Sequence, residues 1–310
     1  MPHSKPRILC FGGLHYDDMI RCEADTILNE SNPVSRTRAP GGVALNVART
    51  LAALGNTVGL SSRVGADREG VELLDYLTRL GITAVSIQTD NTHATARYTA
   101  VLDHTSNLIL GLADMSIYDD FRPAHWQHSR QEIKHWDYWC VDTNLPTDTL
   151  HYLASEKAAQ MLFAVVTSPA KAHRLRQLLP TLDAIFVNRA EASILVNSNT
   201  AASQTIEEQA RALCDLGALR AIVTAGADGA AWACPDNFGH IACPTINPQS
   251  VSGAGDVLAG TTMAALLSGE TLEQALTYGT CAATLSTLSD MNDPQLSWSM
   301  IKDNLVHNDA

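Results

Sequence analysis

Apolar runs of strand length alternate along this chain with amphipathic stretches of helix length. From Gly42 to Leu54, apolar residues recur at spacings of three and four, the period of a helix with one buried face. Strands that alternate with helices favour a mainly parallel sheet covered on both faces. We expect helices at Gly42–Leu54 and Glu69–Leu80, and strands at Arg7–Gly12, Thr57–Ser62, Tyr138–Val141, Leu162–Val166, Ala184–Val187 and Ala221–Thr224, the last four each followed by a helix.

One region departs from this rhythm and is typical of a β-hairpin. Thr95–Leu102 alternates with period two, turn residues follow, and Leu108–Leu112 resumes as a strand. With the loop-rich segment Asp17–Pro40, the hairpin is expected to form a small β-rich lid, from about 15–40 and 93–113, over one edge of the sheet. A lid that excludes water protects a reactive phosphoryl group from hydrolysis. An edge hairpin without function is the alternative.

Composition and charge narrow the classes of partner. The 310 residues are 45% hydrophobic and 17% charged, as in globular proteins, and show no repeat or linker, so we expect a single domain over 1–310. The net charge is −12, and no run of Lys and Arg offsets it, which disfavours nucleic acid and anionic membranes as partners. A polyanionic nucleotide would need local positive potential from backbone N–H groups, a helix end or a metal ion.

The N-terminus and the lengths of the apolar runs predict a cytoplasmic protein. The first apolar run, Ile8 to Phe11, is too short for a signal-peptide core, and no run reaches the length of a membrane span. The seven cysteines are scattered, without short paired spacings, so we expect buried free thiols and neither a zinc site nor a disulfide framework.

The strongest local signal is Gly253-Ala254-Gly255-Asp256, where small residues open a long apolar helix. The first N–H groups of a helix have no partner within it, and the positive end of the helix dipole points outward. Glycines leave those N–H groups accessible to a phosphate. Asp256 then lies beside the anion, where a carboxylate can accept the proton of an attacking hydroxyl group. A Gly-containing loop with Asp256 as a simple helix charge is the alternative.

Three more clusters of small or polar residues are expected at the carboxyl ends of strands, where open α/β sheets place their ligands. Asn46 lies one turn inside the first long helix, on the side expected to be exposed. As an alternative to a ligand contact, its side chain could hydrogen-bond backbone groups. Glu191 lies in a first turn, where a solvated charge is the alternative. The clusters are Gly41-Gly42 with Asn46, Asn188 with Glu191, and Thr224 with Gly226 and Gly229.

Together and in this order, these motifs resemble the ribokinase-like (PfkB) family of sugar and nucleoside kinases. The resemblance spans roughly residues 7 to 290 and adds Asp17, which follows the first strand. It implies a three-layer α/β/α fold with a mainly parallel central sheet, and ATP and Mg²⁺ as cofactors. An oxidoreductase is disfavoured, because Gly12-Gly13-Leu14-His15-Tyr16 is not the Gly-x-Gly-x-x-Gly of dinucleotide-binding proteins.

The resemblance also implies a role for each matching residue. Asp256 would be the catalytic base, with Gly253, Ala254 and Gly255 as the anion hole. Asn188 and Glu191 would organise magnesium through water. The nucleotide would contact Asn188, Thr224, Gly226 and Gly229, and the acceptor would contact His15, Asp17, Gly41, Gly42, Asn46 and Asn144.

Within the family, the similarity is greatest to the members that phosphorylate the 5′-hydroxyl group of pseudouridine. Val43, where ribokinases usually have Lys, suits an acceptor with a base attached. Other acceptors, such as ribose, adenosine or a ketohexose, stay open, as does a sensor that has lost turnover. The similarity to pseudouridine kinases rests on Ser31-Asn32-Pro33, Tyr98–Asp103, Ala113–Ile117 and Asn292-Asp293-Pro294.

The chain also departs from the family pattern. His15 replaces the usual Asn, so one sugar contact is altered or lost. Ser250 stands where many members have Asp, which puts a site for a monovalent cation such as K⁺ in question. Ser252 replaces Thr and keeps the hydroxyl group, and Thr167-Ser168-Pro169 replaces the Asp-Pro pattern of pseudouridine kinases.

The expected lid has consequences for assembly. Its hairpin carries strand edges, and unpaired edges invite partners. We therefore expect a homodimer formed through the lid.

Overall fold

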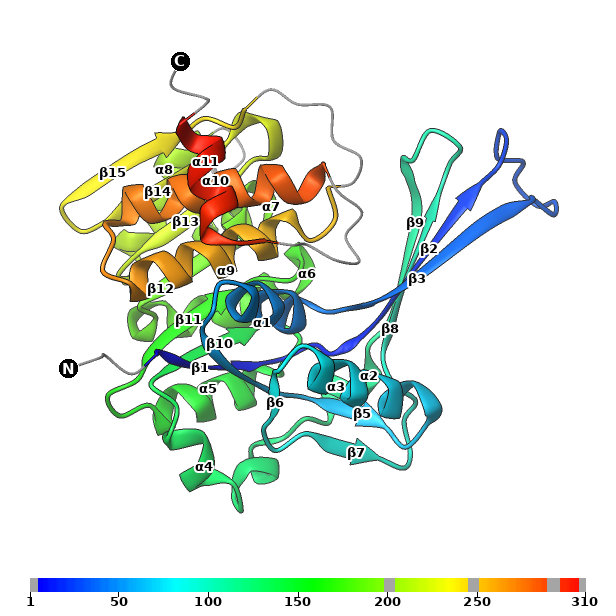
Figure 1. Ribbon diagram of the computed structural model, residues 1–310, viewed down its shortest axis with the longest axis horizontal. Helices are drawn as coiled ribbons and strands as arrows, with labels where there is room; N and C mark the ends of the chain where they lie inside the picture. The colour runs from blue at the N-terminus through cyan, green and yellow to red at the C-terminus, as the bar shows by residue number, and fades with distance from the viewer. Residues whose placement is uncertain (1–4, 198–203, 245–250, 289–295, 307–310) are drawn as a thin grey trace.

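The computed structural model of the chain describes residues 5–197, 204–244, 251–288 and 296–306. Its largest element is a nine-stranded sheet in the order β15-β14-β13-β12-β11-β10-β1-β4-β6 (Figure 1). Neighbouring strands from β13 to β6 are parallel, whereas β14 and β15 are antiparallel additions at one edge. The bounds are β1 Arg7–Phe11, β4 Thr57–Ser61, β6 Thr83–Ala84, β10 Tyr138–Asp142, β11 Met161–Val165, β12 Ala184–Asn188, β13 Ala221–Thr224, β14 Ala230–Cys234 and β15 Asn237–Ile241.

Helices cover both faces of this sheet because its strands bury side chains on both faces. In β1, Ile8 and Cys10 belong to one hydrophobic cluster, whereas Leu9 and Phe11 belong to another, since successive side chains of a strand point to opposite faces. The first face is covered by α1 (Val43–Ala53), α2 (Arg68–Arg79), α9 (Ala254–Leu267), α10 (Leu272–Thr287) and α11 (Trp298–Val306), the second by α4 (Arg130–Lys134), α5 (Thr147–Glu156), α7 (Arg189–Val196) and α8 (Ile206–Asp215).

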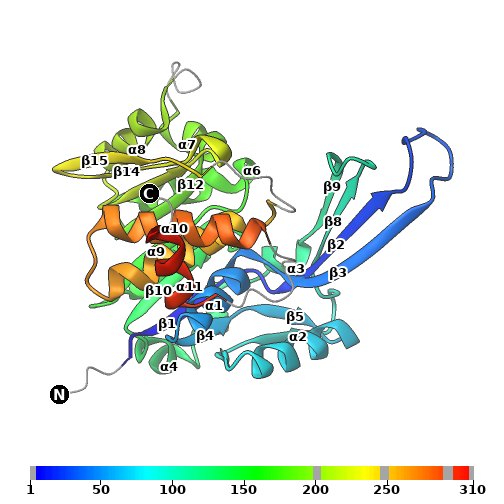
Figure 2. The ribbon, with the colours of Figure 1, turned by 45° about the horizontal axis from the view of Figure 1, so that its top comes forward.

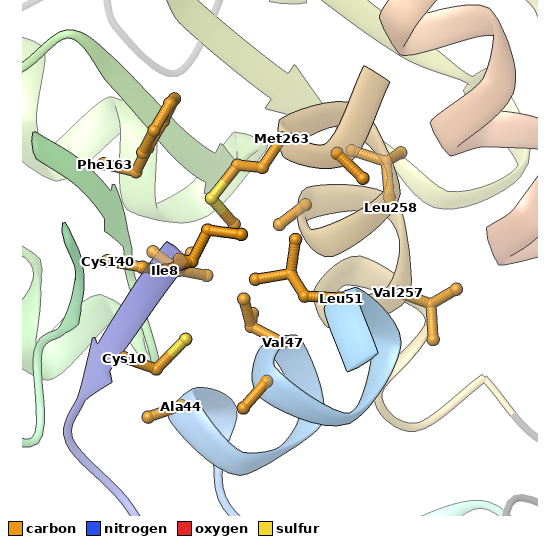
Figure 3. Close-up of a cluster of buried hydrophobic side chains, with 14 of the residues drawn as sticks. Ile8, Cys10, Ala44, Val47, Leu51, Cys140, Phe163, Val257, Leu258 and Met263 are labelled. Atoms are coloured by element: carbon orange, nitrogen blue, oxygen red, sulfur yellow. The ribbon is translucent and has the colours of Figure 1, made fainter. Parts of the chain in front are cut away.

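The first cluster joins segments that are distant in the sequence. Figure 3 shows Ile8 of β1 close to Met263 of α9, with Val47 and Leu51 of α1 beside them. The helix layers on both faces of the sheet confirm the three-layer α/β/α architecture.

The remaining short helices are α3 (Ser116–Asp119), η1 (Pro123–Trp126), α6 (Pro169–Ala172), η2 (His173–Thr181) and η4 (Gly226–Asp228).

A second sheet of four strands, in the order β3-β2-β8-β9, projects away from the helices (Figures 1 and 2). We refer to this sheet as the lid. The segment Asp17–Pro40, expected to be loop-rich, instead forms most of two paired strands. The pattern of hydrophobic residues did not predict β3, because that strand is polar and largely exposed along its length. The bounds are β2 His15–Cys22, β3 Val34–Gly41, β8 Arg97–Leu102 and β9 Leu108–Asp114, and a separate pair consists of β5 Arg63–Gly65 and β7 Gln88–Asp90.

One further expectation about the elements was wrong. The strand Ala221–Thr224 is followed by the short η4 and then by β14, and not by a long helix. Gly226 and Gly229 adopt φ values of +58° and +87°, which glycine accepts readily, and they reverse the chain so that β14 pairs antiparallel with β13. The other expected strands and helices occur within two residues of their expected bounds. All seven cysteines are free.

Ion pairs hold the base of the lid against α2. Asp18 of β2 is 2% exposed and faces the guanidinium groups of Arg36, Arg38 and Arg97. Arg38 and Arg97 also pair with Glu69 of α2. A buried carboxylate is stable only with such partners, so this network attaches the lid to the body of the protein.

Candidate active site

A cavity of about 520 Å³ lies at the carboxyl ends of the central strands, between the sheet and the lid. Such a position is where open α/β sheets bind ligands. Asp17 and Tyr98 of the lid form one part of its wall, and the first turn of α9 forms another. The cavity brings together eleven residues that the sequence predicted for the site: His15, Asp17, Gly42, Asn46, Asn144, Asn188, Glu191, Thr224, Gly253, Gly255 and Asp256.

Four predicted residues do not line the cavity: Gly41, Ala254, Gly226 and Gly229. A Cβ at Gly41 would lie 2.1 Å from Oδ2 of Asp17, so this glycine leaves room for the Asp17 carboxylate. A Cβ at Gly229 would lie 2.2 Å from the carbonyl oxygen of Ile241, so this glycine permits a tight backbone turn. Ser250 and Asn292-Asp293-Pro294 lie outside the described residues.

Asp256 and Asn46 meet in the cavity although they are 210 residues apart in the sequence. Gly253 precedes α9 in the left-handed conformation, with φ +75°, and places Asp256 in the first turn. Asn46 of α1 donates a hydrogen bond from Nδ2 to Oδ2 of Asp256 over 2.8 Å. Arg49 orients this amide by donating to its Oδ1 over 3.1 Å. The amide therefore fixes one carboxylate oxygen of Asp256.

Asn46 is only 7% exposed, so its expected position on an exposed side of the helix was wrong. The reason is tertiary, because α9 packs across this side of α1. A Cβ at Gly260 of α9 would lie 2.8 Å from Cβ of Thr50, so the two helices approach closely. The alternative in which the Asn46 side chain satisfies backbone groups does not describe its hydrogen bonds to Asp256 and Arg49.

The surroundings of Asp256 favour proton transfer near neutral pH. Burial raises the pKa of Asp256 to about 7, opposed by the hydrogen bond from Asn46 and assisted by the negative charges of Asp142 and Asp17. A general base works best when its pKa lies near the working pH. Asp256 therefore has the chemistry of a base for a hydroxyl group.

This pKa predicts the pH dependence of turnover. Because only the ionised carboxylate can accept a proton, kcat should rise about tenfold per pH unit below pH 7 and level off above about pH 8. For the kinase reaction that the resemblance leads us to expect, the measurement is the rate of ADP formation with saturating substrates and magnesium between about pH 5.5 and pH 9. A kcat that does not change between pH 5.5 and 7 would contradict the assignment of the base.

Asn188 and Glu191 form a second polar group, where β12 leads into α7. The Asn188 Oδ1 accepts from the Glu191 N–H, and the Glu191 Oε2 accepts from the Asn188 N–H, so the two side chains cap the helix reciprocally. Glu191 is 4% exposed, which excludes the alternative of a solvated helix charge. Burial raises the pKa of Glu191 to about 7, so a nearby cation would favour its ionised form.

This donor set fits magnesium bound largely through water. Carboxylate and amide oxygens are suitable ligands for Mg²⁺, which usually keeps several waters and is held partly by substrate phosphates. Among the described residues there is no group of three or more His, Cys, Asp or Glu that could hold a metal ion. The oxygens of Asn188 and Glu191 therefore fit a magnesium ion held largely through water.

The sequence analysis missed several residues of the wall. Lys171 of α6 donates to Oδ1 of Asn144 over 2.6 Å, and burial lowers the pKa of its ammonium group. Tyr98 and Met115 supply apolar surface, and the sequence analysis named their stretches only for the resemblance. Val43, which it did connect with the acceptor, also lies in this wall. The alternation of side chains along the lid strands could have indicated Tyr98. It pairs with Asp17 and Ala113 on the neighbouring strands, and both of these residues line the cavity. No local pattern singled out Lys171.

Comparison with known proteins identifies relatives along the whole chain. The pfkB family of carbohydrate kinases matches residues 5–293. Pseudouridine kinase from Escherichia coli is 24% identical over 270 residues, which are 86% of each chain. A carbohydrate kinase from Agrobacterium tumefaciens superposes with a TM-score of 0.84 at 31% identity over 97% of each chain. Ribokinase from Arabidopsis thaliana, solved with ribose and ATP, superposes with a TM-score of 0.85 at 18% identity over 97% of this chain and 99% of that one.

Proposed function

Because the chain belongs to the pfkB family of carbohydrate kinases, we propose that it transfers the γ-phosphoryl group of ATP to a hydroxymethyl group of a nucleoside or sugar, with pseudouridine as the acceptor. The observation that carries the proposal is the hydrogen bond of 2.8 Å between Asn46 and Asp256, which holds a carboxylate of near-neutral pKa in the cavity, in the first turn of α9. We propose that residues 1–310 act as one cytoplasmic kinase domain.

In the proposed reaction, the acceptor hydroxyl oxygen forms a bond to the γ-phosphorus, the bond from that phosphorus to the bridging oxygen of ADP breaks, and Asp256 takes the hydroxyl proton. Negative charge on the transferred group would lie beside Gly253 and Gly255 at the start of α9, where the first N–H groups of a helix and its dipole stabilise anions. The Ala254 N–H also donates to the carbonyl oxygen of Val251 over 3.4 Å. Among the described residues, no atom beyond its sequence neighbours and the backbone of its own helix lies within 4 Å of where a Cβ of Gly255 would be, so the space beside this glycine is open.

Asn188 and Glu191 would hold magnesium through water beside the nucleotide phosphates. The metal supplies charge neutralisation for the transferred group. Asn188 and Thr224, at the ends of the neighbouring strands β12 and β13, would contact the nucleotide. Ser250, the position that bears on a monovalent cation, lies outside the described residues, so no requirement for K⁺ is proposed.

The wall of the cavity supports an acceptor that carries a base. Val43, Tyr98 and Met115 offer apolar surface for a planar ring, whereas Asn144 and Lys171 offer polar groups for its edge. The sugar hydroxyl groups would contact Asp17 and the polar face that begins α1. The similarity to the Escherichia coli pseudouridine kinase favours pseudouridine among nucleosides.

The test is ADP release with ATP and magnesium, measured in parallel with pseudouridine, uridine, adenosine, ribose and fructose. We expect the highest kcat/KM with pseudouridine. If another acceptor of the panel is preferred, the kinase assignment stands and the acceptor is wrong. If none is phosphorylated while pseudouridine still binds, the chain is a non-catalytic sensor, which is the alternative from another class.

We also propose a homodimer formed through the lid. Leu110 and Leu112 of β9 are each 51% exposed, and by strand alternation they lie on the face opposite Ala113, which lines the cavity. Apolar side chains gathered on an open sheet are typical of an interaction surface. A second copy would cover them without closing the cavity.

Substitution of both leucines tests this dimer. The double change Leu110→Lys and Leu112→Lys should convert a dimer into a monomer, as measured by light scattering after size-exclusion chromatography at micromolar concentration. Leu216→Lys is a matched control, because Leu216 is 39% exposed at the end of α8 and away from the lid. A wild-type protein that is itself monomeric would refute the proposal.

A further inference from the structure

Asp142, at the carboxyl end of β10, is a buried carboxylate that no motif of the sequence analysis used. It is 1% exposed. Its Oδ2 accepts hydrogen bonds from the N–H groups of Gly13 at 2.8 Å and Ala44 at 3.0 Å, and from Nδ2 of Asn144 at 3.2 Å. Its Oδ1 accepts from the N–H of Asn144 at 2.8 Å. Four donors converge on this group, which suits an ionised carboxylate, because its oxygens accept and never donate. Burial raises the pKa of Asp142, and the hydrogen bonds from Gly13, Asn144 and Ala44 oppose that rise.

The donors belong to three segments that carry parts of the proposed active site. Gly13 lies in the link between β1 and the lid strand that carries His15 and Asp17. Ala44 lies in the first turn of α1, two residues before Asn46. Asn144 lines the cavity itself. One side chain therefore connects the acceptor wall, the lid strand and the helix that orients the catalytic base.

The backbone around Asp142 is shaped to admit its carboxylate. Gly12 has φ +147°, and a Cβ there would lie 2.2 Å from Cγ of Asp142. A Cβ at Gly13 would lie 2.7 Å from Nδ2 of Asn144. Larger residues at these two positions would collide with the carboxylate or with its partner. The two glycines and the carboxylate thus form one packed unit.

The negative charge of Asp142 also acts electrostatically on α1 and on Asp256. It lies at the N-terminus of α1, where the helix dipole favours a negative charge. The negative charge of Asp142 also raises the pKa of Asp256, after the larger effects of burial and of the Asn46 hydrogen bond. The charged and titratable groups that face this pair are Asp17 of β2, Arg49 of α1, Cys140 of β10, Tyr118 of α3 and Lys171 of α6.

We propose that Asp142 is a positioning residue for phosphoryl transfer, which fixes the start of α1 and the lid strand relative to Asp256 and sets the charge that the base experiences. This inference rests on the proposed kinase activity. Asp142 touches neither substrate nor cofactor in this role, and it acts through Ala44, Asn46 and the loop at Gly13.

Two substitutions separate the two effects. Asp142→Asn keeps the size but removes the charge, so it should move the acid limb of the kcat profile to lower pH by about half to one unit and lower kcat about tenfold. Asp142→Glu keeps the charge but displaces the carboxylate, so it should lower kcat to a similar extent with the acid limb where the wild type has it. The KM for ATP should change little in both.

Asp183→Asn is the matched control. Asp183 is a carboxylate at the opposite end of the same sheet, where it accepts from the N–H of Leu162 at 2.8 Å and pairs with Lys157. We expect this variant to melt at a lower temperature while keeping the kcat and the acid limb of the wild type. A merely structural Asp142 would behave in the same way.

The outcomes decide between the hypotheses. If folded Asp142→Asn keeps the wild-type acid limb and kcat, the inference is wrong. If Asp142→Asn does not fold, Asp142→Glu decides, and wild-type kcat in that variant overturns the positioning role. A wild-type protein that phosphorylates no acceptor of the panel refutes the proposed function instead, so the two failures are distinguishable.

Discussion

Replacing Asp256 with Asn should lower kcat by about 10³-fold or more while leaving ATP affinity nearly unchanged. The amide keeps the size of the side chain and can still contact Asn46, but it cannot take the proton of the acceptor hydroxyl group. The measurements are single-turnover ADP formation and the dissociation constant of ATP from calorimetry. Near-normal kcat in this variant would show that Asp256 is not the base.

Glu273→Gln is the control for a simple helix charge. Glu273 lies in the first turn of α10, as Asp256 does in α9, but its side chain is exposed and lies outside the cavity. Removing its charge should leave kcat within about twofold of the wild type, because such charges contribute about 0.3–1 kcal/mol of stability. Equal losses of activity in both variants would favour a common structural effect.

Thermal stability distinguishes lost chemistry from lost folding. Because the folded protein raises the pKa of Asp256 to about 7, it binds this proton more tightly than the unfolded chain. The bound proton therefore adds to the free energy of unfolding at low pH, and this contribution is lost as pH rises through about 7. Asp256→Asn should therefore melt at a higher temperature than the wild type at pH 8, and the difference should disappear on acidification.

Gly42→Ala should lower kcat/KM by about 100-fold, the second largest effect that we expect. Gly42 has φ +108°, and a Cβ there would lie 2.4 Å from the carbonyl oxygen of Gly13. Backbone cannot move aside as a side chain can, so the start of α1 must shift and carry Asn46 away from Asp256. Steady-state kinetics with the preferred acceptor should show both a lower kcat and a higher KM.

Gly55→Ala is a matched control at the other end of α1. Gly55 also has a positive φ, +86°, but a Cβ there would meet nothing within 4 Å. Its cost should be limited to about 1 kcal/mol of backbone strain, without a change in kinetics. If both variants lose activity equally, strain alone explains the effect and the contact with Gly13 does not matter.

Much of the fold and the site could be predicted because the relevant signals are local. Alternating apolar runs indicate the central strands, and Gly253 with Gly255 marks a helix start that can accept an anion. Asn188 and Glu191 follow a buried strand and cap the next helix, a pattern visible within four residues. Such features depend on neighbours in the sequence and need no knowledge of packing.

The errors and omissions depend on residues that are distant in the sequence. The burial of Asn46 depends on α9 packing across α1, and the sequence of α1 contains no sign of that neighbour. Asp142 looks like the polar end of an ordinary strand until Gly13 and Ala44 converge on it. Lys171 becomes part of the wall only when α6 approaches Asn144. The strand β3 was missed because it is exposed along most of its length.

The division of the site between two sheets has a consequence for affinity. Asp17 belongs to the lid, whereas Asn46 and Asp256 belong to helices on the body, so an acceptor that contacts all three ties the lid to the body. By thermodynamic linkage, the apparent affinity for the acceptor is the intrinsic affinity reduced by the fraction of molecules whose lid is in place. Weakening the ion pairs of Glu69 with Arg38 and Arg97 would therefore raise KM for the acceptor without changing any group that touches it.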